Sequence, residues 1–124
     1  MKKEITKIID KAKKDKKVIA IALFGSSLKG EGRDIDICVF LDKVYSNLEM
    51  SRKKLELLKG LNNKVDLQVF QQLPIYIRIR VIGEGKILFC KNENLLYETA
   101  FSTIKEFGFF KKLYDMYLEG IKNG

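Results

Sequence analysis

Hydrophobic residues recur along the chain with helical spacing in some segments and with strand spacing in others. Residues 2–16 predict an amphipathic helix whose apolar face carries Ile5, Ile8, Ile9 and Ala12. Residues 17–24 form a short, nearly continuous apolar run, which predicts a buried strand that Gly25 ends. Residues 34–41 alternate in polarity and predict a second strand, with Asp34, Asp36, Cys38 and Phe40 on one face and Ile35, Ile37, Val39 and Leu41 on the other.

The middle of the chain predicts a helix and a third strand. Ser46 and Glu49 match a capping box, and the helix that they open extends to about Lys59. The leucine spacing in this helix predicts an inward face made of Leu48, Leu55 and Leu58. Residues 64–70 predict a strand whose apolar pattern is interrupted by Asp66.

The last third of the chain contains one ambiguous segment. Residues 73–81 alternate as in a strand, whereas the proline in this segment suits the first turn of a helix. Residues 86–90 predict a short edge strand. A long helix, capped by Asn92 or Asn94, follows and extends to about Ile121.

This order of elements predicts an α/β or α+β domain in which helices flank a small mixed β-sheet. The 124 residues match the size of one compact domain, so we expect a single domain over residues 1–124. The longest apolar runs fall far short of the ~20 residues of a membrane span. The charged N-terminus also lacks the apolar segment of a signal peptide, and a cytoplasmic protein is expected.

The composition narrows the chemistry that this chain can perform. The sequence has no histidine, so the usual general base of hydrolases and a common zinc ligand are both missing. Cys38 and Cys90 lie in apolar surroundings and are interpreted as buried, reduced thiols. The net charge of +8, from 24 Lys plus Arg against 16 Asp plus Glu, favours an anionic ligand or partner. Nucleic acid is not expected as the partner, because the basic runs lack interleaved aromatic residues.

Three aspartates are the candidates for catalysis. Asp34 and Asp36 lie on one face of the second predicted strand, because side chains two residues apart on a strand point the same way. Asp66 lies in the third strand, and paired strands are about 4.8 Å apart. If these strands pair in the right register, the three carboxylates converge and suit Mg²⁺, and two such ions about 4 Å apart would clamp a phosphoryl group. The alternative is a solvated strand edge with Arg33 and Lys64 as ion-pair partners.

The segment before Asp34 adds groups that suit a phosphate. Gly25 and Ser26 lie where a strand ends and a helical turn is expected, so they offer backbone N–H groups and a hydroxyl to an anion. Lys29 supplies a positive charge in the same segment. No Gly-Lys-Ser/Thr follows at the spacing of a P-loop, so the segment belongs to another class of nucleotide site.

The Gly-Ser pair, the Asp-x-Asp motif and the aspartate of the next strand resemble the DNA-polymerase-β-like nucleotidyltransferase superfamily. The chain's size and its segment LPIYIRIRVIGEGKILFCKNENLLYE resemble the minimal nucleotidyltransferases (MNT), the antitoxins of HEPN/MNT toxin–antitoxin pairs. The resemblance covers nearly the whole chain from Lys17 onward. It implies a polymerase-β-like core with a long C-terminal helix, and it implies that residues 74–82 form a helix.

The resemblance also implies roles for the site residues. Asp34 and Asp36 would bind both metal ions, and Asp66 would bind one of them and help to activate the acceptor hydroxyl. Gly25 and Ser26 would hold the phosphates of the nucleotide. The loop between Ser26 and Asp34 is shorter than in many members of the family.

The function that this resemblance implies is Mg²⁺-dependent protein adenylylation. In the family, the MNT protein moves AMP from ATP onto a tyrosine of a HEPN ribonuclease toxin and silences it. We therefore expect ATP as substrate, two Mg²⁺ ions as cofactors and a HEPN-family toxin as partner. Two alternatives stay open: a catalytically idle antitoxin that acts by binding its toxin, and a basic nucleic-acid-binding module with steeply salt-dependent affinity.

The final helix has more apolar residues than one packing stripe needs. They are Tyr97, Ala100, Phe101, Ile104, Phe107, Phe110, Leu113, Tyr114, Tyr117 and Ile121. The half nearest Leu95 is expected to pack on its own sheet. For residues 109–121, packing within the chain and contact with a partner both stay open, and a homo-oligomer through this helix is one form of that contact.

Overall fold

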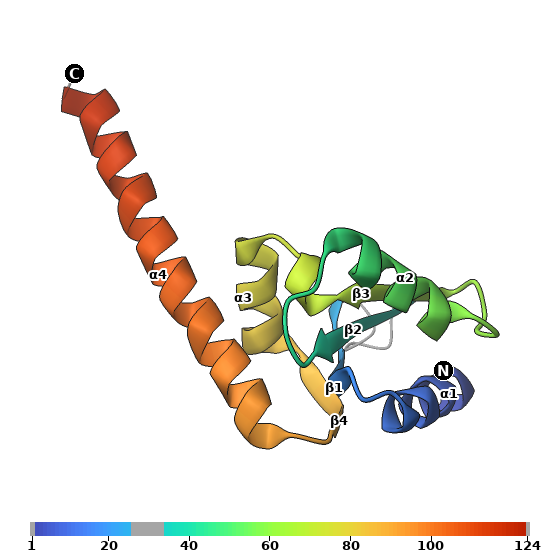
Figure 1. Ribbon diagram of the computed structural model, residues 1–124. Helices are drawn as coiled ribbons and strands as arrows, with labels where there is room; N and C mark the ends of the chain where they lie inside the picture. Colours follow the sequence, from blue (N-terminus) through green and yellow to red (C-terminus); the bar gives the residue numbers. More distant parts are fainter. Residues whose placement is uncertain (1, 26–33, 124) are drawn as a thin grey trace.

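The computed structural model describes residues 2–25 and 34–123 and contains a four-stranded mixed sheet between helices (Figure 1). Its elements are, in chain order, α1 (Lys2–Lys14), β1 (Val18–Leu23), β2 (Ile35–Leu41), α2 (Asn47–Leu58), β3 (Val65–Val69), η2 (Phe70–Gln72), α3 (Ile75–Glu84), β4 (Lys86–Cys90) and α4 (Glu93–Asn123). The strand order is β3-β2-β1-β4, with β2 and β3 parallel and the other neighbours antiparallel. The predicted α+β class with a long C-terminal helix is confirmed.

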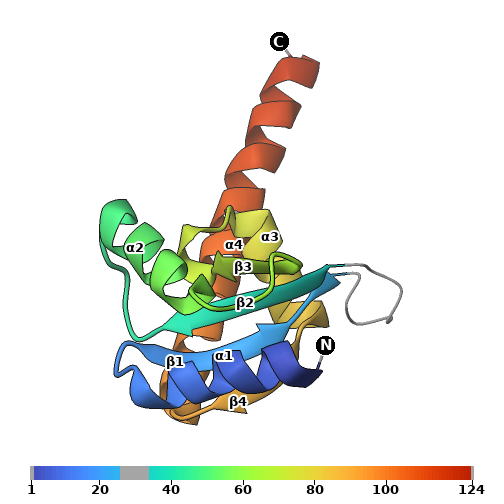
Figure 2. The ribbon, with the colours of Figure 1, turned by 90° about the vertical axis from the view of Figure 1, so that its right-hand side faces the viewer.

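Different helices cover the two faces of the sheet. Helices α1 and α2 pack on one face, where Ile8, Met50 and Leu57 meet the inward residues of β2. Helix α3 and the first turns of α4 pack on the other face. Figure 2 shows the molecule from the side of α1 and α2, with α3 and α4 behind the sheet. The predicted alternation of β2 is confirmed, because Ile37 belongs to the first core and Phe40 to the second.

The predicted inward face of α2 is wrong in part. Leu48 and Leu55 are 62% and 68% exposed, whereas Met50 and Leu57 are buried. Both pairs are seven residues apart, so the spacing alone does not select the face that meets the sheet. The capping box is confirmed, because the Ser46 side chain accepts a hydrogen bond from the backbone N–H of Glu49. Leu58 is half-buried against the first core.

The ambiguous segment is a helix, as the family resemblance implies. Helix α3 spans Ile75–Glu84 and follows Pro74, whose fixed φ suits a helix start. The isoleucines alternate, but Ile77 and Val81 also have the i, i+4 spacing that places them on one helical face, and both pack in the second core. Strand β4 then forms the predicted sheet edge next to β1.

Two lysines join the first helix to its neighbours. Lys91 donates from Nζ to the backbone oxygens of Ala12 and Asp15, at 2.8 and 2.7 Å. Lys11 donates from Nζ to the oxygens of Leu57, at 3.0 Å, and of Lys59. Cations at helix C-termini satisfy carbonyls that have no partner within the helix. These contacts fix α1 against the end of β4 and the end of α2.

Both cysteines are free thiols, as predicted, but only one of them is fully buried. Cys38 is buried in β2, and Cys90 is half-buried in β4. Burial raises the pKa of Cys38 to about 12, so this thiol is protonated at neutral pH and unreactive.

The side chain of Gln71 forms two hydrogen bonds with the backbone of Leu41 at the end of β2, and their contribution to stability can be measured. Its Oε1 accepts from the backbone N–H of Leu41 at 3.1 Å, and its Nε2 donates to the Leu41 oxygen at 2.8 Å. Gln71→Ala leaves both backbone groups without these partners, and we expect it to lower the free energy of unfolding by about 1–3 kcal/mol. Gln72→Ala removes only exposed contacts to α2 and is the control, with an expected loss below about 0.5 kcal/mol. Urea unfolding followed by circular dichroism measures both, and equal losses would refute this role of Gln71.

Candidate functional site

The parallel pairing of β2 and β3 places two of the predicted aspartates opposite each other. The register pairs Asp36 with Asp66, and Asp34 lies directly before β2. Asp36 is half-buried, whereas Asp34 and Asp66 are exposed. Because paired residues on neighbouring strands point to the same face, the Asp36 and Asp66 carboxylates share one side of the sheet. The register thus brings Asp36 and Asp66 to one face, whereas the predicted convergence of all three carboxylates is not formed by the side chains of the described residues.

Gly25 lies directly against the Asp36 carboxylate. The end of β1 is fixed to β2 by a hydrogen bond from the Phe24 N–H to the Asp36 oxygen, at 3.0 Å. Gly25 follows with a φ of 70°, in the left-handed region that favours glycine. A Cβ atom at this position would lie 2.8 Å from Oδ2 of Asp36. The sequence therefore needs glycine here for two reasons, the backbone conformation and the space that the carboxylate occupies.

Gln68 is a site residue that the sequence reasoning missed. Its Nε2 donates to Oδ1 of Asp66 at 3.1 Å, which orients that carboxylate. In the described part of the chain, no lysine or arginine forms an ion pair with Asp66. The sequence could have indicated this contact, since Gln68 is two residues after Asp66 and residues two apart on a strand share a face. Among the described residues, Asp66 is thus held by a neutral amide and not by a cation.

The donor set suits Mg²⁺ that arrives with a nucleotide. Within residues 2–25 and 34–123, no three Asp, Glu or Cys side chains lie close enough together to hold a metal ion. The side chains thus do not form a ready-made site of three protein ligands. Mg²⁺ is usually bound by one or two carboxylates together with water and substrate phosphates, which fits paired carboxylates such as Asp36 and Asp66.

Two predicted nucleotide-binding residues, Ser26 and Lys29, lie outside the described residues. Their proposed contacts with phosphate therefore rest on the sequence. The described neighbours place them in the chain between the Asp36-contacting Gly25 and Asp34. In Figure 2, the end of β1 and the start of β2, which flank this segment, lie side by side.

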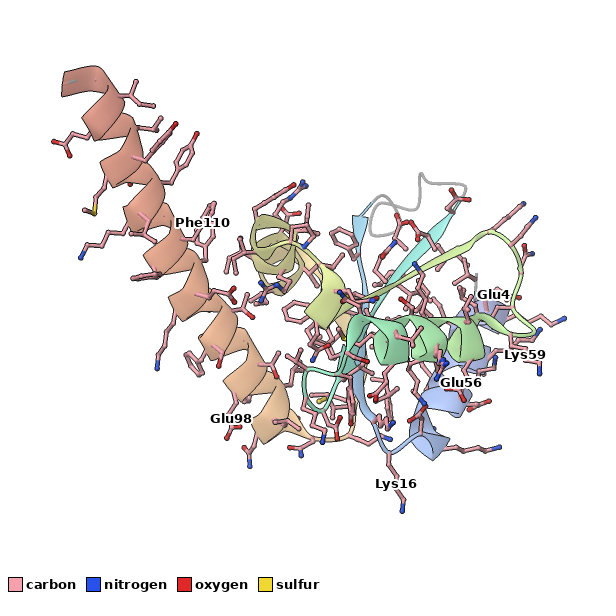
Figure 3. All side chains as sticks on the ribbon, turned by 45° about the horizontal axis from the view of Figure 1, so that its top comes forward. Glu4, Lys16, Glu56, Lys59, Glu98 and Phe110 are labelled. Carbon is pink, nitrogen blue, oxygen red and sulfur yellow. The ribbon has the colours of Figure 1, made fainter. Side chains whose placement is uncertain are left out.

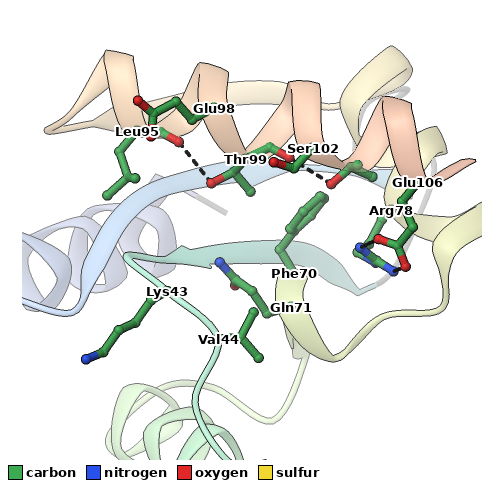
Figure 4. A pocket seen from close by; sticks show the side chains of 11 residues that line it. Lys43, Val44, Phe70, Gln71, Arg78, Leu95, Glu98, Thr99, Ser102 and Glu106 are labelled. Carbon is green, nitrogen blue, oxygen red and sulfur yellow. Dashed lines mark hydrogen bonds and ion pairs between the residues drawn. The ribbon is translucent and has the colours of Figure 1, made fainter.

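A pocket of about 470 Å³ lies at the other end of β2 from the carboxylates (Figure 4). Its walls come from the segment after β2, from η2, and from one face of α4; they include Lys43, Phe70, Gln71, Glu98, Ser102 and Thr103. Arg78 and Glu106 form an ion pair at its edge, with Nη1 and Oε2 3.0 Å apart. The hydrogen bond from Arg78 lowers the pKa of the Glu106 carboxyl. Because of its position, this pocket is separate from the aspartate site.

The helices on the first face carry charges of both signs. Figure 3 shows Lys16, Lys59, Glu4 and Glu56 on the α1 and α2 side of the molecule. Residues 2–17 and 46–64, which form these helices and their ends, contain 13 Lys and Arg against 5 Asp and Glu. The net positive charge of the chain is therefore concentrated in the elements on this side.

Paired carboxylates beside a glycine at a strand end fit the nucleotidyltransferase core that the sequence motif predicts. A family model described as polymerase beta, nucleotidyltransferase, matches residues 6–94, which is more than half of the chain. The chain therefore belongs to the polymerase beta nucleotidyltransferase family.

Individual relatives agree with this family. A Methanocaldococcus jannaschii protein named "putative protein adenylyltransferase" is 39% identical over an alignment of 77 residues, and the match covers 59% of this chain and 57% of that protein. This chain thus aligns with just over half of that relative's length. A crystal structure of a toxin–antitoxin with AMP-PNP contains a chain with a TM-score of 0.67 and 24% identity, over 92% of this chain and 95% of that one.

A second structure has the same fold. It is the Shewanella oneidensis tri-AMPylated HEPN toxin in complex with an MNT antitoxin. The matching chain has a TM-score of 0.66 and 22% identity, over 96% of this chain and 93% of that one. In the described part of this chain, no helix is both long and apolar enough to span a membrane.

Proposed function

We propose that this chain is a protein adenylyltransferase, the MNT antitoxin of a HEPN/MNT pair, which moves AMP from ATP to a tyrosine of a HEPN-family toxin. The observation that carries the proposal is the Asp36–Asp66 register beside Gly25, on the fold of the nucleotidyltransferase family. The relative named as a protein adenylyltransferase and the fold shared with an MNT antitoxin complex support this acceptor. The chain acts as one domain, in the cytoplasm.

The reaction is a displacement at the α-phosphorus of ATP. The tyrosine oxygen forms a bond to that phosphorus. The bond between the α-phosphorus and the oxygen that bridges to the β-phosphate breaks, and pyrophosphate leaves with that oxygen. Asp66 lies exposed at the site and accepts the proton of the tyrosine hydroxyl. Asp34 and Asp36, together with Asp66, would hold two Mg²⁺ ions, which supply charge neutralisation for the phosphates and the leaving group.

The backbone around Gly25 has its own task in this proposal. A glycine at a strand end lets the main chain approach a ligand closely, because no side chain intervenes. Gly25 and Ser26 would donate backbone N–H groups and a hydroxyl to the ATP phosphates, and Lys29 would add a positive charge. These roles place the triphosphate beside the Asp36 carboxylate, which Gly25 contacts.

Labelled ATP tests the proposal directly. The chain is incubated with Mg²⁺, a HEPN-family toxin and ATP that carries the label on either the α- or the γ-phosphate. AMP transfer predicts that the partner gains the α-label and not the γ-label, and that a chelator abolishes the gain. Label from the γ-position would indicate a phosphotransferase instead, and neither label would refute the proposed reaction with this acceptor.

A further inference from the structure

The outer half of α4 is a large apolar surface that no described residue covers. Figure 1 shows that this half extends away from the sheet and from α3. Its apolar residues, called here the distal arc, are Phe109, Phe110, Leu113, Tyr114, Met116, Tyr117, Leu118 and Ile121. Each of them is at least 44% exposed. With half-exposed large side chains, the arc presents roughly 800 Å², which is about one side of a specific protein interface.

One part of the distal arc continues the stripe by which α4 packs on its own domain. The packing stripe of the inner half advances by alternating steps of four and three residues, through Leu96, Ala100, Thr103 and Phe107. Thr103 in this stripe is buried. The same alternation extends through Phe110, Tyr114, Tyr117 and Ile121. A strict spacing of this kind keeps one seam facing a neighbouring helix. The inner half uses the seam against the domain, and the outer half presents it to solvent.

The other part of the distal arc is in line with the pocket. Successive helix residues are rotated by about 100°, so Phe109, Leu113 and Met116 lie above Glu98, Ser102 and Glu106 on the same side of α4. Those three inner residues line the pocket at the end of β2 (Figure 4). An element lying along this side of the outer half therefore meets this pocket at its end.

The width of the distal arc decides what kind of partner fits. At about 100° per residue its members spread over about 200° of the helix circumference, and the charged residues Lys111, Lys112, Asp115, Glu119 and Lys122 occupy the remainder. A helix that packs on one surface uses a stripe of about 100°. A second copy of α4 would thus cover only about half of the arc. Two neighbouring helices of a partner would cover all of it.

We propose that the distal arc, with the pocket at its inner end, docks an α-helical protein that seats α4 in an apolar groove between two of its helices. One partner helix continues the seam of Phe107, and the other runs toward the pocket beside Ser102. The stacked rings of Phe110 and Tyr114, with centroids 6.3 Å apart, form a rigid anchor for the groove. The docking surface is remote from Asp36, so it holds the partner without covering the aspartate site.

Two double variants test this docking surface. The binding probe is an inactive HEPN-family toxin. The inference rests on the proposed function only through the choice of this probe. Leu113→Lys with Tyr117→Lys changes the distal arc. Tyr97→Lys with Phe101→Lys changes the opposite side of the inner half, at side chains that are also more than half exposed, and adds the same charge. Calorimetric titration is expected to show that the first variant binds the probe at least about 100-fold more weakly than the wild-type chain does. The affinity of the second variant is expected to change by less than about threefold.

Separate outcomes distinguish this inference from the proposed reaction. Unchanged affinity of the arc variant overturns the docking surface, even if AMP transfer proceeds. Arc-dependent binding without AMP transfer supports the surface and refutes the reaction. Light scattering on the chain alone is expected to give the mass of a monomer. An oligomer that becomes monomeric in the arc variant would show that a second copy of the chain occupies the distal arc, and this result would overturn the inference. Absence of any complex with the wild-type chain overturns it as well. Equal thermal midpoints of the variants control for folding.

Discussion

Asp36→Asn is expected to lower AMP transfer by about 10²–10³-fold and to leave the fold intact. Asparagine has nearly the same size as aspartate, so the contact with Gly25 is kept. The lost negative charge removes a ligand for the ions that neutralise the phosphates, and the loss of one preorganised electrostatic group costs on the order of 10²–10³ in rate. The measurement is initial-rate transfer of labelled AMP, with circular dichroism to check the fold.

Asp10→Asn is the matched control for this change. Asp10 is exposed on α1, on the outer side of the first core, and its replacement removes the same charge from the chain. We expect its transfer rate to stay within about twofold of wild type, because an exposed charge away from the site is screened by solvent. Retained activity of Asp36→Asn, or an equal loss in both variants, would show that the β2 carboxylate is not a metal ligand.

Gly25→Ala is expected to affect both stability and catalysis. At a φ of 70° an alanine costs about 1–2 kcal/mol, and its Cβ would lie 2.8 Å from Oδ2 of Asp36. The carboxylate must then move, and a displacement of about 1 Å in an active site can cost about 100-fold in rate. Thermal unfolding and the transfer assay together measure the two effects.

Two other glycines serve as controls that separate the effect of backbone strain from the effect of the contact with Asp36. Gly60 has a φ of 81°, but a Cβ there meets nothing within 4 Å, so Gly60→Ala is expected to lower stability alone. Gly83 in α3 has neither strain nor contact, and Gly83→Ala is expected to raise stability by about 0.5–1 kcal/mol. If Gly60→Ala lowered transfer as much as Gly25→Ala does, the effect would come from stability and not from Asp36.

The sequence predicted the face on which Asp36 lies, but it did not predict the pairing of its strand. The alternation of residues 34–41 assigned Asp36 to the face of Phe40, and the structure agrees. Alternation cannot reveal that β2 and β3 are parallel, nor that their register pairs Asp36 with Asp66, because register depends on tertiary packing. The contact between Gly25 and Asp36 depends on the same pairing, through the β1–β2 ladder.

The errors in the fold have a similar origin. Leu48 and Leu55 satisfy helical spacing as well as Met50 and Leu57 do, and only the position of α2 on the sheet decides which pair is buried. The alternating isoleucines of α3 fit two periods at once, so the pattern left this segment open, and only the family resemblance implied the helix that the structure has. The wide apolar face of α4 was visible in the sequence. Its division into a packed inner half and an exposed outer half required the structure, because one continuous helix serves both.

The intact mass of the partner tests the central claim most directly. A HEPN-family toxin is produced together with the wild-type chain or with an Asp34→Asn, Asp36→Asn variant, purified, and measured by mass spectrometry with peptide mapping. AMP transfer predicts that the toxin gains the mass of one or more AMP groups on tyrosine with the wild-type chain and none with the variant. An unmodified toxin in a stable complex with the wild-type chain would contradict the account and indicate an antitoxin that acts by binding alone.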